Sequence, residues 1–504
     1  MKKIFAFLIV SFLLTGITSA DDWPMFHHDL NHTGYTESPG PLNNTLLWNY
    51  TTGFTLGTPP ASTPAVANGI LYVGVYDLWE GGNNIYALNA STGEYIWNYS
   101  TAIGDEIKSS PAVANGMVYI GSEDNNIYAL NASNGALVWN YTTGDYVDSS
   151  PAVANGMVYI GSDDHKIYAL NASTGARIWY YLANNFISSS PAVVNDVVYI
   201  GTWDFYVLGA ATGAVYAINA STGAHIWNYG IDSPVEWSSP AVANGMVYVG
   251  SWDHKIYALN ASDGAHIWNY TTGGSVYSSP AVAYGMMYIG SWDNKIYALN
   301  ASTGALIWNY TTGITISTSP AIAGGVVYLG SDDNTMHALN ASTGVQIWDY
   351  YAYDGVDSSP AVANGVLYFV SGGLGRVYAI GTTTSSTTST TTSTSTTTII
   401  PSINNINITG FQFVPINITI NVSDIVNWTN LDSTLHRVVD DNMSLFDSGN
   451  LSQGQSYSFQ FNVSGVIGYH CSLHPTMKGT IIVSGSSTIL LNLGWNLISI
   501  PLVV

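Results

Sequence analysis

The chain has 504 residues and is strongly acidic: 32 Asp and Glu side chains accompany only 10 Lys and Arg, which gives a net charge of −22. A protein that binds nucleic acid needs a basic surface, so this composition excludes that class of function. The length suggests about three domains, and a hydrophobic content of 47% is sufficient for buried cores. The single cysteine rules out an internal disulfide framework.

Residues 1–20 predict a secretory signal peptide. Lys2 and Lys3 precede an apolar run that ends in the small residues Ser19 and Ala20. The run is short for a membrane-spanning helix, although an N-terminal membrane anchor is the alternative. We therefore expect an exported chain, extracellular, on the cell surface or in a periplasm-like space, with no transmembrane helix in its mature part.

Asn-x-Ser/Thr triplets, such as Asn89-Ala-Ser91 and Asn140-Tyr-Thr142, recur along the chain. Each is an acceptor site for N-glycosylation in an exported protein. The triplets also recur because the repeat described below needs a turn and a strand at these places, so we expect only some to be modified. The sequence thus predicts a cell-surface glycoprotein.

Residues 21–380 contain a unit of about forty residues that recurs, which is typical of a solenoid or a propeller. In one copy, residues 149–181, four segments read as short β-strands: SSPAVA, MVYIGS, KIYALNA and ARIWYY. The turns between them are Asn-Gly, Ser-Asp-Asp-His and Ser-Thr-Gly, which favour hairpins. Four strands in each repeat predict one blade of a β-propeller. The proline that opens each copy is Pro64, Pro111, Pro151, Pro191, Pro240, Pro280, Pro320 or Pro360.

The Ser/Thr-Pro strands and the strands that carry a Trp are equal in number but offset by one. Trp48 precedes the first proline strand, and no Trp strand follows the last proline strand after Ser359. The simplest solution is that Leu46–Tyr50 completes the last blade and closes the ring, which removes free strand edges. We therefore predict an all-β, eight-bladed propeller.

The repeat resembles the tryptophan-docking repeat of PQQ-type (pyrroloquinoline quinone) propellers. The resemblance is carried by Tyr168-Ala-Leu-Asn171-Ala-Ser-Thr174-Gly175 followed by Trp179, and by a lead-in over residues 22–34. That family includes quinoprotein dehydrogenases and the non-catalytic scaffold propellers of outer-membrane assembly. The resemblance therefore implies the fold and leaves the activity open.

An Asp occupies the same turn, between the second and third strands, in six blades. Such turns lie at one mouth of a propeller channel, so carboxylates and neighbouring Trp side chains could form a cation or sugar site there. The alternative is that Asp is simply a favourable turn residue, repeated because the blade is repeated, and we prefer this interpretation. The residues are Asp124, Asp164, Asp204, Asp253, Asp293 and Asp333.

A linker over residues 381–400 separates the propeller from a second domain. Thr382–Thr398 contains only Ser and Thr, which cannot form a buried core. Residues 401–484 then show short alternating segments that predict a small Greek-key β-sandwich. Residues 485–504 look like the start of a truncated surface domain. The strands predicted in the sandwich are residues 412–414, 416–420, 425–428, 456–461, 468–471 and 479–483.

Cys471, His474 and Met477 stand at a Cys-x2-His-x2-Met spacing, and His436 lies earlier in the same domain. Two imidazoles, one thiolate and a weak thioether are the ligand types of a type 1 blue-copper centre. The domain resembles the plastocyanin and amicyanin group of cupredoxins, which implies that these four residues hold one copper ion. The family often has Asn after the first His, where it ties the two ligand loops together. Arg437 stands there in this chain, which puts that tie in doubt.

These features predict an exported copper protein that transfers electrons to an unidentified redox partner, with the propeller as a docking or scaffold platform. A protein or a glycan is the expected ligand of the propeller face. Quinoprotein dehydrogenases usually carry a vicinal cysteine pair and irregular repeats, which this chain lacks, so we expect neither enzymatic activity nor bound PQQ. The alternatives are a dehydrogenase that feeds its own copper domain, and an adhesion or scaffold protein of the cell envelope.

Overall fold

Each copy of the repeat folds into a four-stranded antiparallel sheet, as its hairpin turns predict. In the third blade the first turn places Asn155 and Gly156 at φ 52° and 74°, which matches the right-handed twist of the strands it joins. The two central strands are buried on both faces because neighbouring blades stack against each other. This blade contains β11 (Ala152–Ala154), β12 (Met157–Ser162), β13 (Lys166–Asn171) and β14 (Arg177–Leu182), paired in that order.

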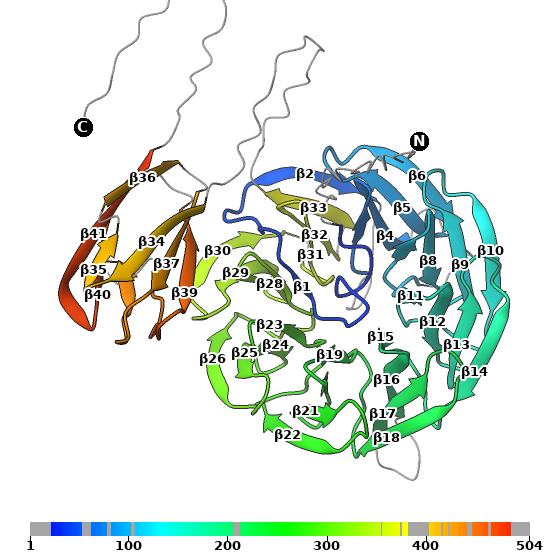
Figure 1. The fold of residues 1–504 in the computed structure, drawn as a ribbon. Coiled ribbons are helices and arrows are strands. Elements are labelled where there is room, and N and C mark those ends of the chain that lie inside the picture. The colour runs from blue at the N-terminus through cyan, green and yellow to red at the C-terminus, as the bar shows by residue number, and fades with distance from the viewer. Residues whose placement is uncertain are drawn as a thin grey trace, which may run out of the picture. The chain divides into compact units, whose positions relative to one another are not determined.

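The structure is a computed structural model, shown in Figure 1, and its chain divides into two compact units, residues 1–386 and 387–504, which are described separately. The predicted signal peptide, most of the linker and residues 485–504 lie outside the described residues. The structure describes residues 22–52, 62–77, 82–101, 106–204, 212–353, 355–372, 375–381, 403–414, 417–421, 424–440, 446–461 and 465–484.

Eight blades surround a central axis, and the ring closes as predicted (Figure 1). The last blade is completed from the N-terminal side, because β2 (Leu46–Thr51) pairs antiparallel with β33 (Arg376–Gly381). The other strands of the last blade are β31 (Ala361–Ala363) and β32 (Val366–Ser371), and β31 lies against β3 (Ala65–Ala67) of the first blade.

The remaining blades repeat this pattern. Their strands are β4 (Ile70–Asp77), β5 (Gly82–Asn89) and β6 (Tyr95–Ser100) with β3; β7 (Ala112–Ala114), β8 (Met117–Gly121), β9 (Asn126–Asn131) and β10 (Leu137–Thr142); β15 (Ala192–Val194), β16 (Val197–Asp204), β17 (Thr212–Asn219) and β18 (His225–Ile231); β19 (Ala241–Ala243), β20 (Met246–Gly250), β21 (Lys255–Asn260) and β22 (His266–Thr271); β23 (Ala281–Ala283), β24 (Met286–Ser291), β25 (Lys295–Asn300) and β26 (Leu306–Thr311); and β27 (Ala321–Ala323), β28 (Val326–Ser331), β29 (Thr335–Asn340) and β30 (Gln346–Tyr351).

One backbone carbonyl joins each blade to the one before it. The oxygen of Ala172 accepts the Trp139 indole N–H at 2.8 Å and the Tyr119 hydroxyl at 3.1 Å. The Trp139 ring also packs on Gly175, leaving no room there for a side chain. All eight junctions share such a carbonyl and seven of them also pack a Trp on a Gly, which explains why Trp, Tyr and Gly recur at fixed places in the repeat. The acceptors are the carbonyls of Ala90, Ala132, Ala172, Ala220, Ala261, Ala301, Ala341 and, for the seventh blade, Pro41.

A second set of hydrogen bonds runs around the channel through the Ser before each proline. The backbone N–H of Ser150 donates to the hydroxyl of Ser190 in the next blade at 2.9 Å. The same bond joins every neighbouring pair from Thr63 to Ser359. The Ser-Pro pattern is therefore explained by contacts between blades as well as by strand geometry. The other pairs are Thr63–Ser110, Ser110–Ser150, Ser190–Ser239, Ser239–Ser279, Ser279–Ser319 and Ser319–Ser359.

The lead-in segment, residues 22–36, crosses the centre of the ring (Figure 1) and covers the free inner edges of the blades. It ends in β1 (Tyr35–Thr36), which pairs in parallel with β27. Burial lowers the pKa of His27 to about 4 and that of His32 to about 3, so both imidazoles are neutral at pH 7. The inner-strand N–H groups that donate to this segment belong to Val66, Val113, Val193, Val242, Val282 and Ile322.

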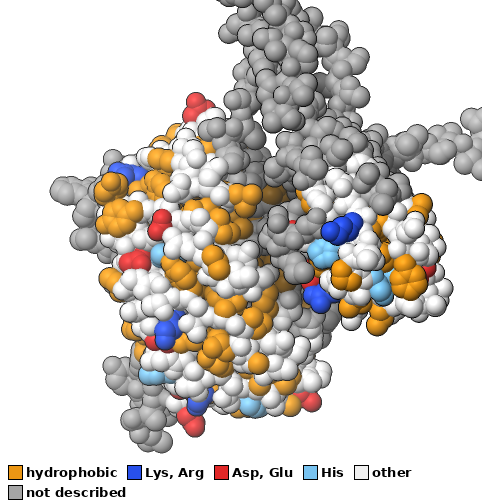
Figure 2. Space-filling view, turned by 90° about the vertical axis from the view of Figure 1, so that its left-hand side faces the viewer, with side chains coloured by type: hydrophobic (Ala, Val, Ile, Leu, Met, Phe, Trp, Pro, Cys, Tyr) orange, Lys and Arg blue, Asp and Glu red, His pale blue; other side chains and the backbone are white. Residues whose placement is uncertain are grey.

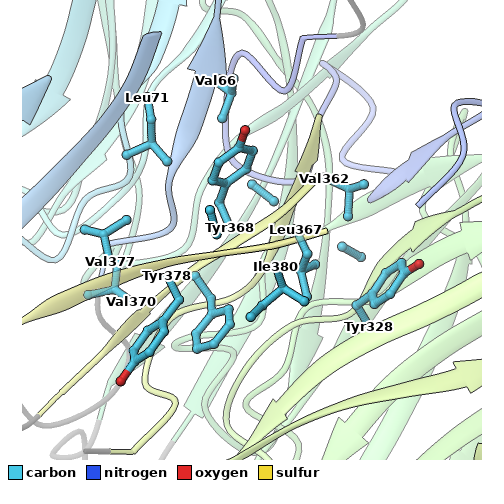
Figure 3. Packing of buried hydrophobic residues seen from close by; sticks show 14 of the residues in the cluster. Val66, Leu71, Tyr328, Val362, Leu367, Tyr368, Val370, Val377, Tyr378 and Ile380 are labelled. Carbon is cyan, nitrogen blue, oxygen red and sulfur yellow. The ribbon is translucent and has the colours of Figure 1, made fainter. Parts of the chain in front are cut away.

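The seam where the ring closes has its own apolar core, shown in Figure 3. Tyr368 and Ile380 of the last blade pack with Val66 and Leu71 of the first blade and with Tyr328 of the seventh. These side chains are at most 3% exposed. The closing blade is therefore joined to both neighbours by packing as well as by hydrogen bonds.

The C-terminal unit is a sandwich of two four-stranded sheets around buried Trp428, in agreement with the prediction. The structure adds two strands to those predicted, β34 and β38. One sheet has the order β35 (Gln412–Val414), β34 (Ile403–Thr409), β37 (Ile425–Asn430) and β39 (Ser456–Gln460). The other has the order β36 (Asn417–Asn421), β41 (His474–Ser484), β40 (Gly465–Cys471) and β38 (Val438–Asp440).

Charged side chains are few and scattered on the face of the molecule in Figure 2, as expected from the low charged content. Within the described residues, no helix has the length and apolar character needed to cross a membrane.

Two glycines of one blade test the junction between blades. Gly156 and Gly175 both have positive φ, but a Cβ at Gly156 would meet nothing within 4 Å, whereas one at Gly175 would lie 2.7 Å from the Trp139 ring. We expect Gly156→Ala to cost about 1 kcal/mol of unfolding free energy from backbone strain alone. Gly175→Ala should cost a further ~1–3 kcal/mol because it displaces the indole. Chemical denaturation of both variants measures the difference, and equal losses would contradict this account of the junction.

Candidate metal centre

Three adjacent strands of one sheet, β41, β40 and β38, place three of the four predicted copper ligands together. Cys471 ends β40 and His474 begins β41, so a tight turn separates them. His436 lies just before β38, and β38 pairs with β40 in a register that sets Val438 opposite Cys471. The chain thereby brings a histidine from one loop beside a cysteine and a histidine from another.

The donor atoms of these residues converge on one point. The Cys471 Sγ lies 3.6 Å from the Nδ1 atoms of both His436 and His474, and the two Nδ1 atoms are 3.3 Å apart. Donors bonded to one ion at ~2.0–2.3 Å, in a tetrahedral or trigonal arrangement, stand about 3.3–3.8 Å from one another. In the described residues this is the one group of three such side chains whose donor atoms lie this close. The set fits a single transition-metal ion.

Met477 completes the predicted set from β41, where its side chain is 4% exposed in the same core as Cys471. Its role as an axial ligand remains a prediction. His470 is not expected to be a ligand, because alternation along the strand points it to the opposite face from Cys471. In the structure Cys471 is fully buried, whereas His470 is partly exposed.

The main chain of Arg437 ties the two ligand loops together, which answers the doubt raised by its sequence. Its N–H donates to the Cys471 sulfur at 3.4 Å, and its carbonyl accepts the N–H of Ser472 at 2.9 Å. The guanidinium turns outward and pairs with the Asp447 carboxylate. A side chain other than Asn is tolerated here because backbone atoms make the connection.

Asp432 orients the buried histidine and was missed by sequence reasoning. Its carboxylate accepts the N–H groups of Gly410 at 2.8 Å and Phe411 at 3.1 Å, and lies 3.1 Å from the Nε2 of His436. Burial would raise the pKa of Asp432, but these N–H groups and the His436 ring outweigh it and hold the pKa below its ordinary value. A carboxylate on the far nitrogen fixes the ring and leaves Nδ1 for the metal. The available signal was an Asp four residues before the histidine.

An apolar rim surrounds the more accessible histidine. Cys471 and His436 are fully buried, whereas His474 is partly exposed. The Phe411 ring stands edge-on to the His474 ring at 5.0 Å and is itself 51% exposed. Leu435 and Leu473, also about half exposed, belong to the loops that carry the two histidines. The site is closed to water on its inner side and presents one imidazole among apolar side chains.

Five of the six repeated Asp residues are turn residues, as preferred from the sequence, whereas Asp204 is the last residue of β16 and pairs with Thr212 of β17, so its predicted place in a turn was wrong. In the third blade Asp164 accepts the N–H of Lys166 and the hydroxyl of Tyr168, and its carboxylate also accepts the N–H of Gly144. The same bonds recur around Asp124, Asp253, Asp293 and Asp333, with minor changes. These five carboxylates therefore hold together the turn between the second and third strands of their blades.

Comparison with known protein families identifies both units. A model described as outer membrane protein assembly factor BamB, of the PQQ-type repeats, matches residues 40–202, 103–239 and 211–412. The chain belongs to this family. A second model, copper binding proteins of the plastocyanin/azurin family, matches residues 402–484. The protein is therefore a PQQ-type repeat propeller fused to a plastocyanin/azurin-type copper-binding domain. The sequence matches no curated protein.

Solved structures share the propeller fold. A europium-containing methanol dehydrogenase matches with a TM-score of 0.62 and 15% identity, over 72% of this chain and 98% of its own. A quinohemoprotein alcohol dehydrogenase from Comamonas testosteroni matches with a TM-score of 0.61 and 17% identity, over 72% of this chain and 80% of its own. BamB from Moraxella catarrhalis matches with a TM-score of 0.52 and 19% identity, over 68% of this chain and 98% of its own. Identities this low show the fold alone.

These matches overturn the prediction that the chain is not an enzyme, because dehydrogenases are built on the same propeller. The prediction rested on the missing cysteine pair and on regular repeats, and neither feature is needed to form this backbone. The expectation that PQQ does not bind has no support from these matches either.

Asp432→Asn tests the orientation of the buried histidine. The amide keeps the shape but removes the negative charge that stabilises the oxidised, more positive state of a bound copper ion, so we expect a higher reduction potential. Copper affinity should fall about tenfold or more, as is common when a carboxylate behind a metal-bound histidine is lost. Voltammetry and competition with a chelator measure the two effects. Asp447→Asn removes the same charge from the outward-facing Arg437 pair and is the matched control. Equal shifts in both variants would show that only overall charge matters.

Proposed function

We propose that this protein is an exported electron-transfer protein whose C-terminal domain holds one type 1 copper ion on His436, Cys471, His474 and Met477. The observation that carries the proposal is the convergence of one thiolate and two imidazole nitrogens within 3.6 Å of one another in a copper-binding domain. Bound copper would supply a one-electron couple. Soft sulfur donors with two imidazoles favour copper over magnesium, calcium or manganese.

The protein supplies a donor set that is already in place. Backbone bonds from Arg437 to Cys471 and Ser472 hold the two ligand loops together, and Asp432 holds the His436 ring. Few groups then have to move when the charge of the site changes, which favours fast electron exchange. Full burial of Cys471 and His436 keeps water from the inner side of the site.

His474 and the surrounding apolar rim are the proposed contact with a redox partner. Phe411, Leu435 and Leu473 expose about half of their side chains beside the one accessible imidazole. A small apolar patch binds transiently, which suits a carrier that must dissociate after each transfer. We propose that the propeller is a docking platform, that a protein or glycan binds its face, and that the chain is exported.

A second candidate is a dehydrogenase activity in the propeller that delivers electrons to the copper domain. The observation that favours it is the fold shared with the methanol and quinohemoprotein alcohol dehydrogenases. Incubating the full-length protein with PQQ and calcium, followed by dye reduction with an alcohol, tests it. Turnover supports this candidate, and the absence of both a complex and turnover rejects it.

Cys471→Ser tests the copper site itself. Copper-loaded wild-type protein should show an intense visible absorption band, because a thiolate donates charge to Cu(II), and the variant should lose this band completely. Absorption spectroscopy of both proteins at equal copper content is the measurement. His470→Gln changes the neighbouring residue that faces away and should keep the band. An unchanged spectrum in Cys471→Ser would remove the type 1 site.

Leu473→Glu tests the proposed contact surface. A carboxylate in the apolar rim should slow electron self-exchange by about tenfold or more, because it sets like charges opposite each other in the encounter complex. The visible spectrum should not change. Nuclear magnetic resonance line broadening in mixtures of the oxidised and reduced protein gives the rate. Val345→Glu, at an exposed position of the propeller, adds the same charge elsewhere. A rate that falls equally in both variants would exclude this rim as the contact.

A further inference from the structure

The residues that vary within an otherwise constant repeat gather at one mouth of the propeller channel. Six links between blades each supply one variable residue to the lining of this cavity, at the first or, before the fifth blade, the second position after a buried aliphatic side chain. These six residues are Lys108, Asp148, Ser188, Trp237, Tyr277 and Ser317, and the lining also includes Phe26 of the lead-in and the Ser or Thr residues that precede the prolines. The repeat therefore keeps its structural residues constant and changes those that face the channel.

The link before the fifth blade departs from the repeat at this mouth. Other links have one residue between the aliphatic side chain and the Ser/Thr pair, such as Asp148 after Val147, whereas this link has both Glu236 and Trp237 after Val235. The extra residue places a carboxylate and an indole together where other blades supply one side chain.

Two buried carboxylates, Asp148 in the lining of the cavity and Glu236 next to the lining residue Trp237, each have an oxygen without a hydrogen-bond partner. The Glu236 side chain belongs to a residue that is 7% exposed, and its Oε2 makes no hydrogen bond. The Asp148 side chain is also 7% exposed, lines the cavity, and has an unpartnered Oδ1. Burial raises the pKa of Glu236 to about 8 and that of Asp148 to about 7, and nearby carboxylates including Asp163 add to both shifts. Buried acceptors without donors are costly, and they call for a ligand that donates hydrogen bonds.

Charge at the mouth favours a cation. Glu106, Glu123, Asp148, Asp163 and Glu236 interact electrostatically around a single ammonium group, that of Lys108. The Lys108 Nζ already lies 2.5 Å from Glu123, 3.8 Å from Asp148 and 5.8 Å above the Trp237 ring. The protein thus binds one alkylammonium group of its own with carboxylates and an indole, and the other carboxylates stay without a cation.

Aromatic rings extend from the free carboxylates toward the surface. Tyr277 lines the cavity and stacks on Trp292 at 4.0 Å with the planes 9° apart, and Trp292 is 42% exposed. A cation beside such rings gains a further attraction from their faces. The enclosed space of about 40 Å³ accommodates a head group the size of one or two water molecules, so the rest of a ligand would extend outward along these rings.

We propose that the propeller channel binds a small organic ammonium ion, whose N–H groups donate to Asp148 and Glu236 while its substituent lies against Tyr277. The spacing of the oxygens favours an ammonium group over a bare metal ion. Among the described residues, no three carboxylates bring their oxygens within 4.8 Å of one another, as direct metal coordination would need. The proposal concerns the propeller and is independent of the copper site.

The test is calorimetric titration of full-length, copper-loaded protein with benzylamine hydrochloride in a phosphate buffer free of amines. We expect one site per chain with an affinity in the millimolar range or tighter. Benzyl alcohol has the same ring without the charge and should not bind. Asp148→Asn and Glu236→Gln should each weaken benzylamine binding about tenfold or more, because a charged hydrogen bond is lost. Asp263→Asn, in an exposed turn, removes one charge elsewhere and should leave the affinity unchanged.

A melting curve of Glu236→Gln without ligand separates a binding role from a structural one. In a buffer at about pH 9, above the pKa of about 8, Glu236 is ionised, and an amide removes the cost of this buried, unpartnered carboxylate, so the melting temperature should rise by about 2–4 °C. A clear fall would show that Glu236 is a structural residue and would overturn the proposal. So would binding of benzyl alcohol as tight as that of benzylamine, unchanged affinity in both carboxylate variants, displacement of benzylamine by calcium chloride, or no binding at millimolar concentration.

Discussion

The propeller depends on a shared acceptor at each junction between blades. The Ala172 carbonyl accepts both the Trp139 indole and the Tyr119 hydroxyl, so its two lone pairs are used in a place with little access to water. One backbone atom thereby fixes two large rings and sets the distance and angle between blades. The shared acceptor occurs at all eight junctions of the ring. The closing copy uses Pro41, so the N-terminal segment is part of the ring and not an appendage.

The blades, the closure of the ring and the donor set of the candidate metal centre could be predicted from the sequence because each depends on fixed spacing. An offset of one between proline and tryptophan strands is enough to show that Leu46–Thr51 belongs to the last blade. Likewise, a thiol, an imidazole and a thioether on one short loop form a donor set that is typical of copper. The strand Ile403–Thr409 was harder to recognise, because three asparagines, which strands disfavour, dilute its apolar pattern. Whether the propeller is catalytic could not be read either, since a backbone fold does not depend on the residues that decide an activity.

The carboxylates that recur in the repeat differ from those of the proposed channel site. Asp164 recurs because it accepts bonds that hold its turn together, and it has none to spare for a ligand. Its neighbour Asp163 changes to Trp or Glu in other blades and belongs to the group that acts on the channel. In a protein built from repeats, the residues that recur in every copy maintain the fold. The residues that differ between copies make the blades chemically different around the channel. In the copper domain the contact between the two ligand loops does not depend on the side chain at position 437, because backbone atoms of Arg437 make it.

The last blade has a consequence for how this protein folds. Its outer strand comes from the beginning of the propeller sequence and its third strand from the end, so the sheet can form only after the whole repeat region has been synthesised. Until then β2, which carries Trp48, has no strand to pair with, and the first blade has no last blade packed against it. Contacts between such distant parts of a chain form slowly, because the entropy of closing a long loop is lost before the contacts contribute any stabilising free energy. The earlier blades, by contrast, form from neighbouring residues and can assemble in order. Folding of the last blade therefore requires both ends of the propeller sequence, whereas the other blades can fold nearly independently. Loss of residues from either end of the propeller should open the same blade.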